Sequence, residues 1–197
     1  TDQELCVSGA CESIPAGIPD RGDIIITEMM GNPAAVSDKK GEWIEVYNTT
    51  SNKLSLFSII LEDNETGSGK DSYTIVDKNA VVPANGYAVF AVETDKTKNG
   101  GVSGAYHYKG SHLKNSPSDM MIKLVRQDGT VVDEAYYGDP KSGVAQQFGK
   151  NSYKGVGGSI AVNSNDTATT WCDATSTFGD GDKGTPGEEN GKCVIPR

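Results

Sequence analysis

The sequence lacks any uninterrupted apolar run near the roughly 18 to 20 residues that a helix needs to cross a bilayer, and no positively charged leader precedes an apolar segment. We therefore expect no membrane insertion, and we expect any signal peptide to have been removed.

Positive charge is scarce, because 18 Lys and Arg residues stand against 27 Asp and Glu residues, which gives a net charge of −9. Such a chain repels phosphate backbones, so nucleic acid is not expected as a partner.

Motifs of nucleophilic catalysis are also missing. The sequence has no G-x-S-x-G turn, and its two histidines, His107 and His112, lie close together in one loop-like segment. Side chains in such a segment are expected to be exposed, which argues against a transition-metal site. Pairs of carboxylates carry little information here, because some pair among 27 acids will be close by chance. The sequence therefore predicts a protein that is not an enzyme.

The four cysteines stand in two groups at the ends of the chain and form no C-x-x-C pair: Cys6, Cys11, Cys172 and Cys193. Of the three possible pairings we favour Cys6–Cys11 with Cys172–Cys193, because each bridge then closes a short loop. The chain-entropy relation gives these bridges about 2 and about 3 kcal/mol. A zinc site would need closer ligand spacing. Disulfides indicate an oxidising compartment, so we expect a secreted or cell-surface protein.

The composition, with 36% hydrophobic and 23% charged residues, favours one folded domain. Residues 1–21 show no periodicity and hold several turn-forming residues, so we interpret them as an extension ahead of a domain at 22–197. From there, short runs rich in Ile, Val, Tyr and Phe alternate with turn residues, which is typical of an all-β fold. The predicted strands are 24–29, 42–47, 58–62, 72–76, 87–92, 121–125 and 131–136.

Alternating strands must bury one face against a second layer, so we expect two packed sheets with long loops. The pair Asp128-Gly129 predicts a tight hairpin between the last two strands. Within 42–47, Trp43, Glu45 and Tyr47 share one face and Ile44 and Val46 share the other, and Trp43 is interpreted as a core anchor. Glu28 and Glu45 are either solvent-facing or buried acceptors for backbone amides.

After residue 138 the strand signal weakens. Residues 138–158 predict surface loops with at most one edge strand, and a further strand is expected near 159–162. The tail 177–191 is rich in glycine and acids, so we expect an open loop that the Cys172–Cys193 bridge ties back. Phe178 is the only large apolar side chain between these two cysteines.

Several segments occur in a characteristic order: Ile26-Thr27-Glu28, Gly41 to Asn48, Val82 to Phe90, Asp128 to Asp133, Gly184 to Gly187, and Asn190. Together they resemble the bacterial branch of the lamin tail domain family, over roughly residues 23–190. The resemblance implies an immunoglobulin-like β-sandwich without catalytic residues, often attached to secreted or cell-surface bacterial proteins and sometimes to extracellular nucleases. No coiled-coil heptads precede the domain, and paired cysteines do not suit a nuclear protein, so filament assembly and nuclear partners are not carried over.

One acidic loop is the single indication of a cofactor. Asp180-Gly181-Asp182 resembles the beginning of a calcium loop, which makes Asp180 and Asp182 the candidate calcium ligands. The bidentate glutamate of an EF-hand is absent from its usual position, so a solvated acidic turn is the alternative interpretation. No other cofactor is expected.

We therefore expect a monomeric, non-catalytic binding or structural module whose partner is a protein or a glycan at the cell surface. The alternative is an accessory domain that brings substrate to a secreted nuclease or carbohydrate-active enzyme. Sugars would then stack on exposed aromatic rings, for which the candidates are Tyr106, Tyr108, Tyr136 and Tyr137. Asn48, Asn64 and Asn165 match the N-glycosylation pattern, and their turn-rich contexts favour surface loops.

Overall fold

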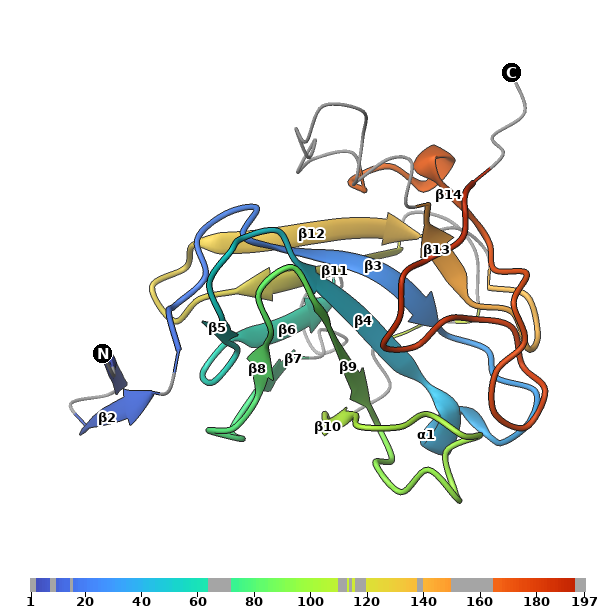
Figure 1. Cartoon of the computed structure of the whole chain (residues 1–197), viewed down its shortest axis with the longest axis horizontal. Helices are drawn as coiled ribbons and strands as arrows, with labels where there is room; N and C mark the ends of the chain where they lie inside the picture. Colours follow the sequence, from blue (N-terminus) through green and yellow to red (C-terminus); the bar gives the residue numbers. More distant parts are fainter. Residues whose placement is uncertain are drawn as a thin grey trace.

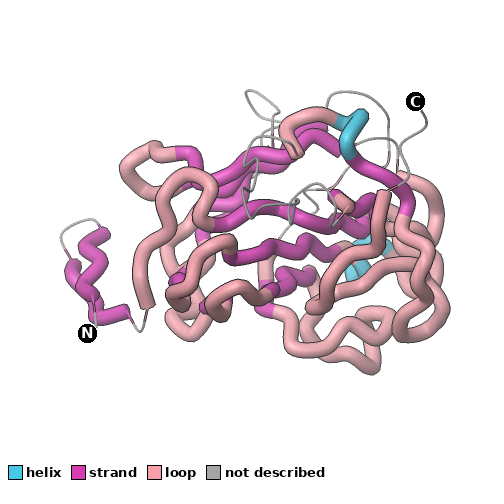
Figure 2. Tube along the Cα trace, turned by 45° about the horizontal axis from the view of Figure 1, so that its top comes forward, coloured by secondary structure: helices cyan, strands magenta, loops and turns pink. Residues whose placement is uncertain are grey.

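The computed structural model describes residues 3–7, 10–14, 16–63, 72–109, 113, 115, 120–137, 140–149 and 165–193, with backbone alone for residues 3–14. Nearly all of its regular structure is strand, which confirms the predicted all-β class. Two sheets pack against each other, and long loops gather at the end of the molecule away from the N terminus (Figures 1 and 2).

The larger sheet has six strands in the order β10, β9, β4, β3, β13, β14, and all neighbours are antiparallel except β9 and β10. These strands span Tyr106–His107 (β10), Tyr87–Ala91 (β9), Trp43–Asn48 (β4), Ile24–Met30 (β3), Gln146–Phe148 (β13) and Trp171–Asp173 (β14). The smaller sheet is antiparallel in the order β12, β11, β6, β7. It comprises Val131–Tyr137 (β12), Met120–Val125 (β11), Ile60–Asp63 (β6) and Ser72–Thr74 (β7). The seven strands predicted from sequence are thus confirmed.

Shorter elements complete the fold: β5 (Leu54–Ser55) paired with β8 (Val81–Val82), the helical turn α1 (Asp38–Gly41), the 3-10 turn η2 (Ala168–Thr170), and the hairpin of β1 (Gln3–Val7) and β2 (Ala10–Ile14). The β1–β2 hairpin lies in the segment for which the sequence predicted no regular structure. Its register sets Cys6 opposite Cys11. Their side chains lie outside the described residues, so this bridge stays a prediction. Gly17 bridges to Leu54, which joins the end of this segment to the domain.

The hairpin between β11 and β12 is confirmed. The amide of Arg126 donates to the carbonyl of Thr130 at 2.8 Å, and the amide of Gly129 donates to the carbonyl of Arg126 at 2.9 Å. Gly129 has φ +86°, a backbone conformation that glycine adopts without a steric penalty. The local sequence was sufficient here because the turn depends on neighbouring residues alone.

The prediction of at most an edge strand within 138–158 is wrong, because β13 pairs with β3 on one side and with β14 on the other. This strand has three residues, Gln-Gln-Phe, which is too short to show an alternating pattern. Its position is therefore set by tertiary pairing rather than by local signal. The strand predicted near 159–162 lies outside the described residues.

The main hydrophobic core fills the space between the two sheets. It includes Ile44 and Val46 from β4, Leu61 from β6, and Ile122 and Leu124 from β11, all of which are buried. Full burial of an aliphatic side chain contributes about 1.5–3 kcal/mol, so this layer is the principal source of stability. The predicted assignment of Ile44 and Val46 to one face of their strand is confirmed.

The opposite face of the larger sheet is covered too. Every residue of β3 and β4 is buried, which explains why the sequence of β3 does not alternate between apolar and polar residues. A second apolar cluster on this face includes Met30, Trp43 and Val89, and Phe178 from the tail packs against it. Residues 174–193, drawn in red in Figure 1, therefore form a third layer, and the predicted open loop is wrong.

Candidate functional site

A β-bulge in β3 brings two carboxylates together beneath the tail. The register of β3 on β4 shifts between Ile26 and Glu28, so Thr27 is the additional residue and Glu28 stands opposite Glu45. Both glutamates are buried, with no exposed surface. A bulge changes the direction of side chains along the bulged strand. Here the Thr27 hydroxyl donates to Glu45 Oε1 at 2.7 Å.

Glu28 holds the tail through one residue, Thr185. The backbone amide of Thr185 donates to Glu28 Oε1 at 3.1 Å and to Oε2 at 3.0 Å. The Thr185 hydroxyl lies 3.0 Å from Glu28 Oε2 and 2.8 Å from Asn190 Oδ1. A hydroxyl carries one proton and can donate to only one of these oxygens. When Glu28 is protonated, it can donate to Thr185, and Thr185 can donate to Asn190.

Glu45 holds the next turn of the tail. The backbone amide of Gly187 donates to Glu45 Oε2 at 2.7 Å, and the next amide, that of Glu188, donates to the carbonyl of Thr185 at 2.9 Å. The Gly187 amide and the Thr27 hydroxyl thus give each oxygen of Glu45 a donor. The interpretation of Glu28 and Glu45 as buried acceptors for backbone amides is thus confirmed, and the solvent-facing alternative is excluded.

Asn190 fixes the end of this turn. Its Nδ2 donates to the carbonyl of Thr27 at 2.8 Å and to the carbonyl of Phe148 at 3.0 Å, and its side chain is fully buried. The bulge leaves Thr27 outside the regular ladder, so the Asn190 amide satisfies a carbonyl that would otherwise be unpaired. The predicted bridge Cys172–Cys193 is confirmed, and it ties the last described residue of the tail to β14.

Burial shifts the proton affinity of the two glutamates. Desolvation raises the pKa of Glu28 to about 8, against the lowering effect of the hydrogen bonds from Thr185. Desolvation also raises the pKa of Glu45 well above its usual range, and the charge of Glu28 raises it further. Two neighbouring carboxylates cannot both ionise at low cost in a desolvated site. The pair is therefore expected to retain a proton at neutral pH.

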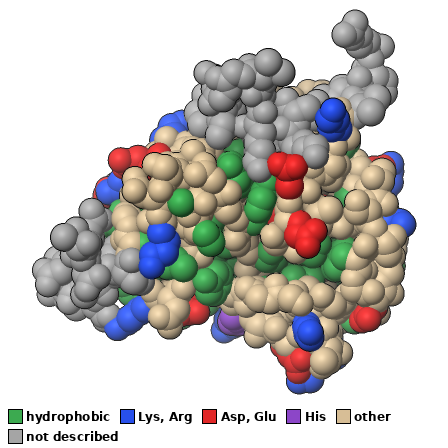
Figure 3. Space-filling view, viewed as in Figure 1, with side chains coloured by type: hydrophobic (Ala, Val, Ile, Leu, Met, Phe, Trp, Pro, Cys, Tyr) green, Lys and Arg blue, Asp and Glu red, His purple; other side chains and the backbone are tan. Residues whose placement is uncertain are grey.

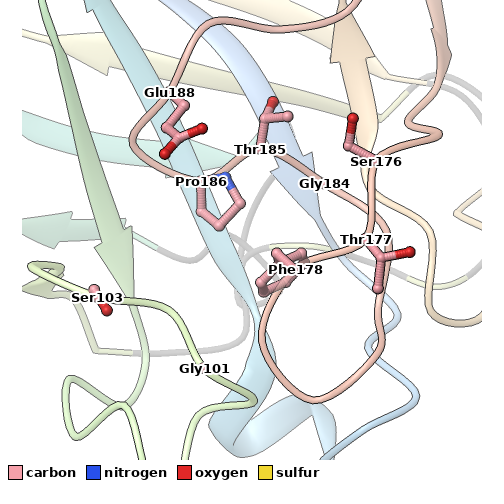
Figure 4. Close-up of a pocket in the computed structure, with 9 residues that line it drawn as sticks. All are labelled: Gly101, Ser103, Ser176, Thr177, Phe178, Gly184, Thr185, Pro186 and Glu188. Carbon is pink, nitrogen blue, oxygen red and sulfur yellow. The ribbon is translucent and has the colours of Figure 1, made fainter.

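Above this pair, the tail and the loop after β9 enclose an open cleft of about 370 Å³. Gly101 and Ser103 come from the loop, and the tail provides the opposite wall (Figure 4). The lining residues of the tail are Ser176, Thr177, Phe178, Gly184, Thr185, Pro186 and Glu188. The two walls touch where the Asp180 amide donates to the Gly100 carbonyl at 3.0 Å. The cleft is thus built on the backbone that Glu28 and Glu45 hold.

The two candidate calcium ligands have different surroundings. Asp182 is buried, and the amides of Ala34 and Ala35 donate to its carboxylate at 3.1–3.3 Å, so it fastens the tail to the loop after β3. Asp180 is exposed. Within the described part of the chain, no group of three or more His, Cys, Asp or Glu side chains is arranged to hold a metal. Calcium binding stays a prediction.

Another buried carboxylate connects the two sheets. Asp133 on β12 accepts from the amide of Ile26 at 2.7 Å and from Asn165 Nδ2 at 2.8 Å. Asn165 also donates to the carbonyl of Ile26 at 3.1 Å, and Trp171 Nε1 donates to the carbonyl of Asn165 at 2.9 Å. Desolvation raises the pKa of Asp133 well above its usual range. These contacts give Asp133 a structural role.

The same contacts correct the expectation that the glycosylation motifs lie on the surface. Asn165 is buried in the network around Asp133. Asn48 is also buried, and its Nδ2 donates to the carbonyls of Asn52 and Val82 at 2.7 and 3.2 Å. Neither side chain can accept a glycan without breaking these bonds. Asn64 lies outside the described residues.

The four tyrosines proposed for sugar stacking do not form one surface. Tyr108 and Tyr137 are buried, and Tyr106 is partly buried with its ring 5.8 Å from that of Phe90. Tyr136 is also partly buried. None of the four lines the cleft described above. Of the two histidines, His107 is exposed as expected, and His112 lies outside the described residues.

The sequence marks some residues of this site but does not reveal their roles. Thr185, Gly187 and Asn190 fell within the segments that carry the family resemblance, but their contacts with the glutamates could not be read from them. Ser103 and Ser176 were not identified at all. No local pattern marks a serine in a loop that becomes part of a cleft only when a distant segment packs beside it.

More than half of the chain matches a known protein family. The lamin tail domain family model matches residues 18–139, and a search of curated proteins finds no match. The matched span contains β3, β4 and β9 together with both buried glutamates, whereas Thr185 and Asn190 lie beyond it. Among the described residues, no helix is long and apolar enough to span a membrane. Because the matched span covers more than half of the sequence, the chain belongs to the lamin tail domain family.

Proposed function

We propose that this domain is a non-catalytic extracellular binding module, and that the cleft between the loop after β9 and the tail is its ligand surface. Membership of a family of immunoglobulin-like structural and binding domains supports the general class. Loops that a rigid sandwich positions are the usual place for recognition on such a fold. The position of the cleft, between two loops over a fully buried part of the sheet, fits this pattern.

The hydrogen bonds that the buried acids accept support a non-catalytic role most directly. Glu28, Glu45 and Asp133 are the buried carboxylates whose raised pKa would suit general acid or base chemistry. Each of them accepts hydrogen bonds from backbone amides far away in sequence. A carboxylate that must leave such bonds in order to react would release the tail or separate the two sheets.

The extracellular assignment rests on the disulfide and on charge. The Cys172–Cys193 bridge closes the third layer over the sheet, and such bridges persist in oxidising compartments. The net charge of −9 keeps the domain soluble and disfavours binding to nucleic acid. A protein or a glycan outside the cell remains the expected class of partner.

A cleft-filling variant tests the proposal. Ser103 is exposed on the wall of the cleft, so Ser103→Trp should block the cleft without disturbing the buried contacts. Ser51→Trp, at an exposed turn outside the cleft lining, is the matched control. Ligands selected from peptide-display and glycan-array libraries should bind the natural domain and the control, and fail to bind the cleft-filling variant. Equal binding by all three proteins would reject the cleft as the ligand surface.

The absence of catalysis is tested separately. The purified domain should not hydrolyse nucleic acid, peptide or glycan substrates above the background of a buffer control. Reproducible hydrolysis that Glu28→Gln or Asp133→Asn abolishes, with the fold retained by circular dichroism, would overturn the non-catalytic assignment.

A further inference from the structure

Among the described residues that line the cleft, Glu188 is the only one with an ionisable side chain. Glu188 is exposed on the tail, and no ion pair with another described residue engages its carboxylate. None of the lining residues is a lysine or an arginine. On the face seen in Figure 3, acidic side chains lie beside hydrophobic ones near the middle, and basic side chains lie elsewhere on the face, some of them also beside hydrophobic ones.

The cleft also presents hydroxyl groups that can accept hydrogen bonds. Ser103 and Ser176 are exposed on opposite walls. On the same wall as Ser176, the ammonium of Lys183 donates to the hydroxyl of Thr177 at 2.5 Å. The hydroxyl oxygen of Thr177, which lines the cleft, therefore already accepts a hydrogen bond from an ammonium group of the protein itself.

An aromatic ring lies between the two walls. Phe178 is partly buried, and its ring meets Trp43 edge to face with centroids 5.8 Å apart and an interplanar angle of 84°. Gly184 permits this packing, because a Cβ there would lie 3.0 Å from Trp43 Cζ2 and 3.1 Å from Phe178 Cε1. Trp43 thus fixes the ring, which lines the cleft together with Pro186 and Glu188 (Figure 4).

Building on the binding function proposed above, we propose that the cleft receives a lysine or arginine side chain from an extended segment of a partner protein. The ammonium or guanidinium group pairs with Glu188 and donates to a serine hydroxyl of one wall, while its methylene groups pack on Phe178 and Pro186. A cation beside an aromatic ring gains further attraction from the quadrupole of the ring. The cleft is open, so the flanking backbone of the partner can continue across it.

These features favour a basic peptide over a neutral sugar. Sugar-binding sites on β-sandwiches use broad exposed aromatic faces, and the tyrosines considered for that role are buried or lie away from the cleft. A cleft lined by one partly buried phenylalanine and one carboxylate suits a cation better. The net charge of −9 also attracts a basic segment at long range and accelerates its encounter with the domain.

Isotope-edited NMR titration with two peptides tests the proposal. The first is a capped pentapeptide, Gly-Ala-Lys-Ala-Gly, and the second is identical except that the lysine is Nε-acetylated and therefore neutral. The first should shift the amide signals of Gly101, Ser176 and Gly184, and the second should bind at least several-fold more weakly. Raising NaCl from about 0.05 M to about 0.3 M should weaken binding of the first peptide.

Three variants should change the affinity for the lysine peptide in three different ways. Glu188→Gln should weaken binding about two- to fivefold, the range for a partly exposed ion pair. Lys183→Gln should strengthen binding, because it removes a competing ammonium beside Thr177. The control is Asp77→Asn, which removes one acid from an exposed turn outside the cleft lining and keeps an oxygen for the amide of Asn79, so it should leave affinity unchanged.

The outcomes distinguish a failure of the cationic ligand from a failure of the cleft as a binding surface. Equal shifts by the acetylated and the free lysine peptides, or cleft shifts by a neutral oligosaccharide alone, would overturn the cationic ligand and leave the cleft as a binding surface. Shifts that map away from the cleft would overturn the proposed site for the basic side chain. If peptide, sugar and display-selected ligands all leave the cleft signals unmoved, both the cationic ligand and the proposed function are wrong.

Discussion

The backbone amide of Gly187 donates a 2.7 Å hydrogen bond to Glu45 Oε2, although the two residues are 142 positions apart in sequence. Glu45 stands on a central strand of the larger sheet, and Gly187 lies in a tail without regular secondary structure. In a sheet, a neighbouring strand would provide a carbonyl as acceptor for this backbone amide. Here the buried carboxylate of Glu45 provides the acceptor instead. The third layer of the fold is therefore held by polar contacts as well as by the packing of Phe178 on Trp43.

The acceptor that Glu45 provides should matter more than its charge. Glu45→Gln keeps an oxygen for the Gly187 amide, and its nitrogen can donate to the Thr27 hydroxyl, whereas Glu45→Ala leaves the Gly187 amide unpaired. The Ala variant should therefore be less stable than the Gln variant by about 1–3 kcal/mol in the free energy of unfolding. In Glu28→Gln, the amide can donate to the Thr185 hydroxyl while the oxygen accepts from the Thr185 amide, and Gln does not ionise on unfolding, so stability at neutral pH should not fall. Urea denaturation at neutral pH measures these values, and equal stability of the two Glu45 variants would contradict the role of Glu45 as an acceptor for the tail.

Stability should fall as pH rises. Glu28 has a folded-state pKa of about 8 against an ordinary value of 4.5, so the folded state retains a proton that the unfolded state releases between these values. The free energy of unfolding should therefore decrease by about 1.4 kcal/mol per pH unit for this group across that window, and level off above it. Glu45 and Asp133, whose pKa values are also raised, add to the same trend.

The pH dependence is measured by denaturation at several pH values from about 5 to about 9. The matched variant is Glu28→Gln, which does not titrate and should have a smaller slope and higher stability than the natural domain at alkaline pH. A slope unchanged by this substitution would show that Glu28 is already ionised in the folded state.

The sequence predicted the parts of this fold that depend on neighbouring residues. The strand at Ile24–Met30 and the Asp128-Gly129 hairpin follow from local composition and turn chemistry. The burial of Glu28 and Glu45 could not be decided locally, because what covers them is supplied by residues 184–190. The tail itself has few apolar residues and resembled an open loop, since hydrogen bonds to distant carboxylates leave no periodic signal. The cleft was missed for the same reason.

Asp182 should stabilise the domain without calcium. Its carboxylate accepts from the amides of Ala34 and Ala35, so Asp182→Ala leaves two amides unpaired and should lower the free energy of unfolding by about 1–3 kcal/mol. The loss should be the same in millimolar Ca²⁺ and in chelator, because the contacts are internal. The exposed Asp180 is the control, and Asp180→Ala should have a small effect in both. A calcium-dependent rise in melting temperature that either variant abolishes would instead establish a metal site.

Removing the disulfide should loosen the end of the tail more than its middle. The Cys172–Cys193 bridge spans 21 residues, so replacing both cysteines with serine should cost about 3 kcal/mol. Residues 184–190 keep their bonds to Glu28, Glu45 and the carbonyl of Thr27, so this turn should stay docked while the residues next to the former bridge become accessible to protease. Limited proteolysis with mass spectrometry should then find the first cuts near residue 193. Adding Glu45→Ala to this variant should move the cuts into residues 184–190, because the acceptor of the Gly187 amide is then removed. If the double serine variant is cleaved first at 184–190, or unfolds as a whole, the glutamate contacts are too weak to hold the third layer.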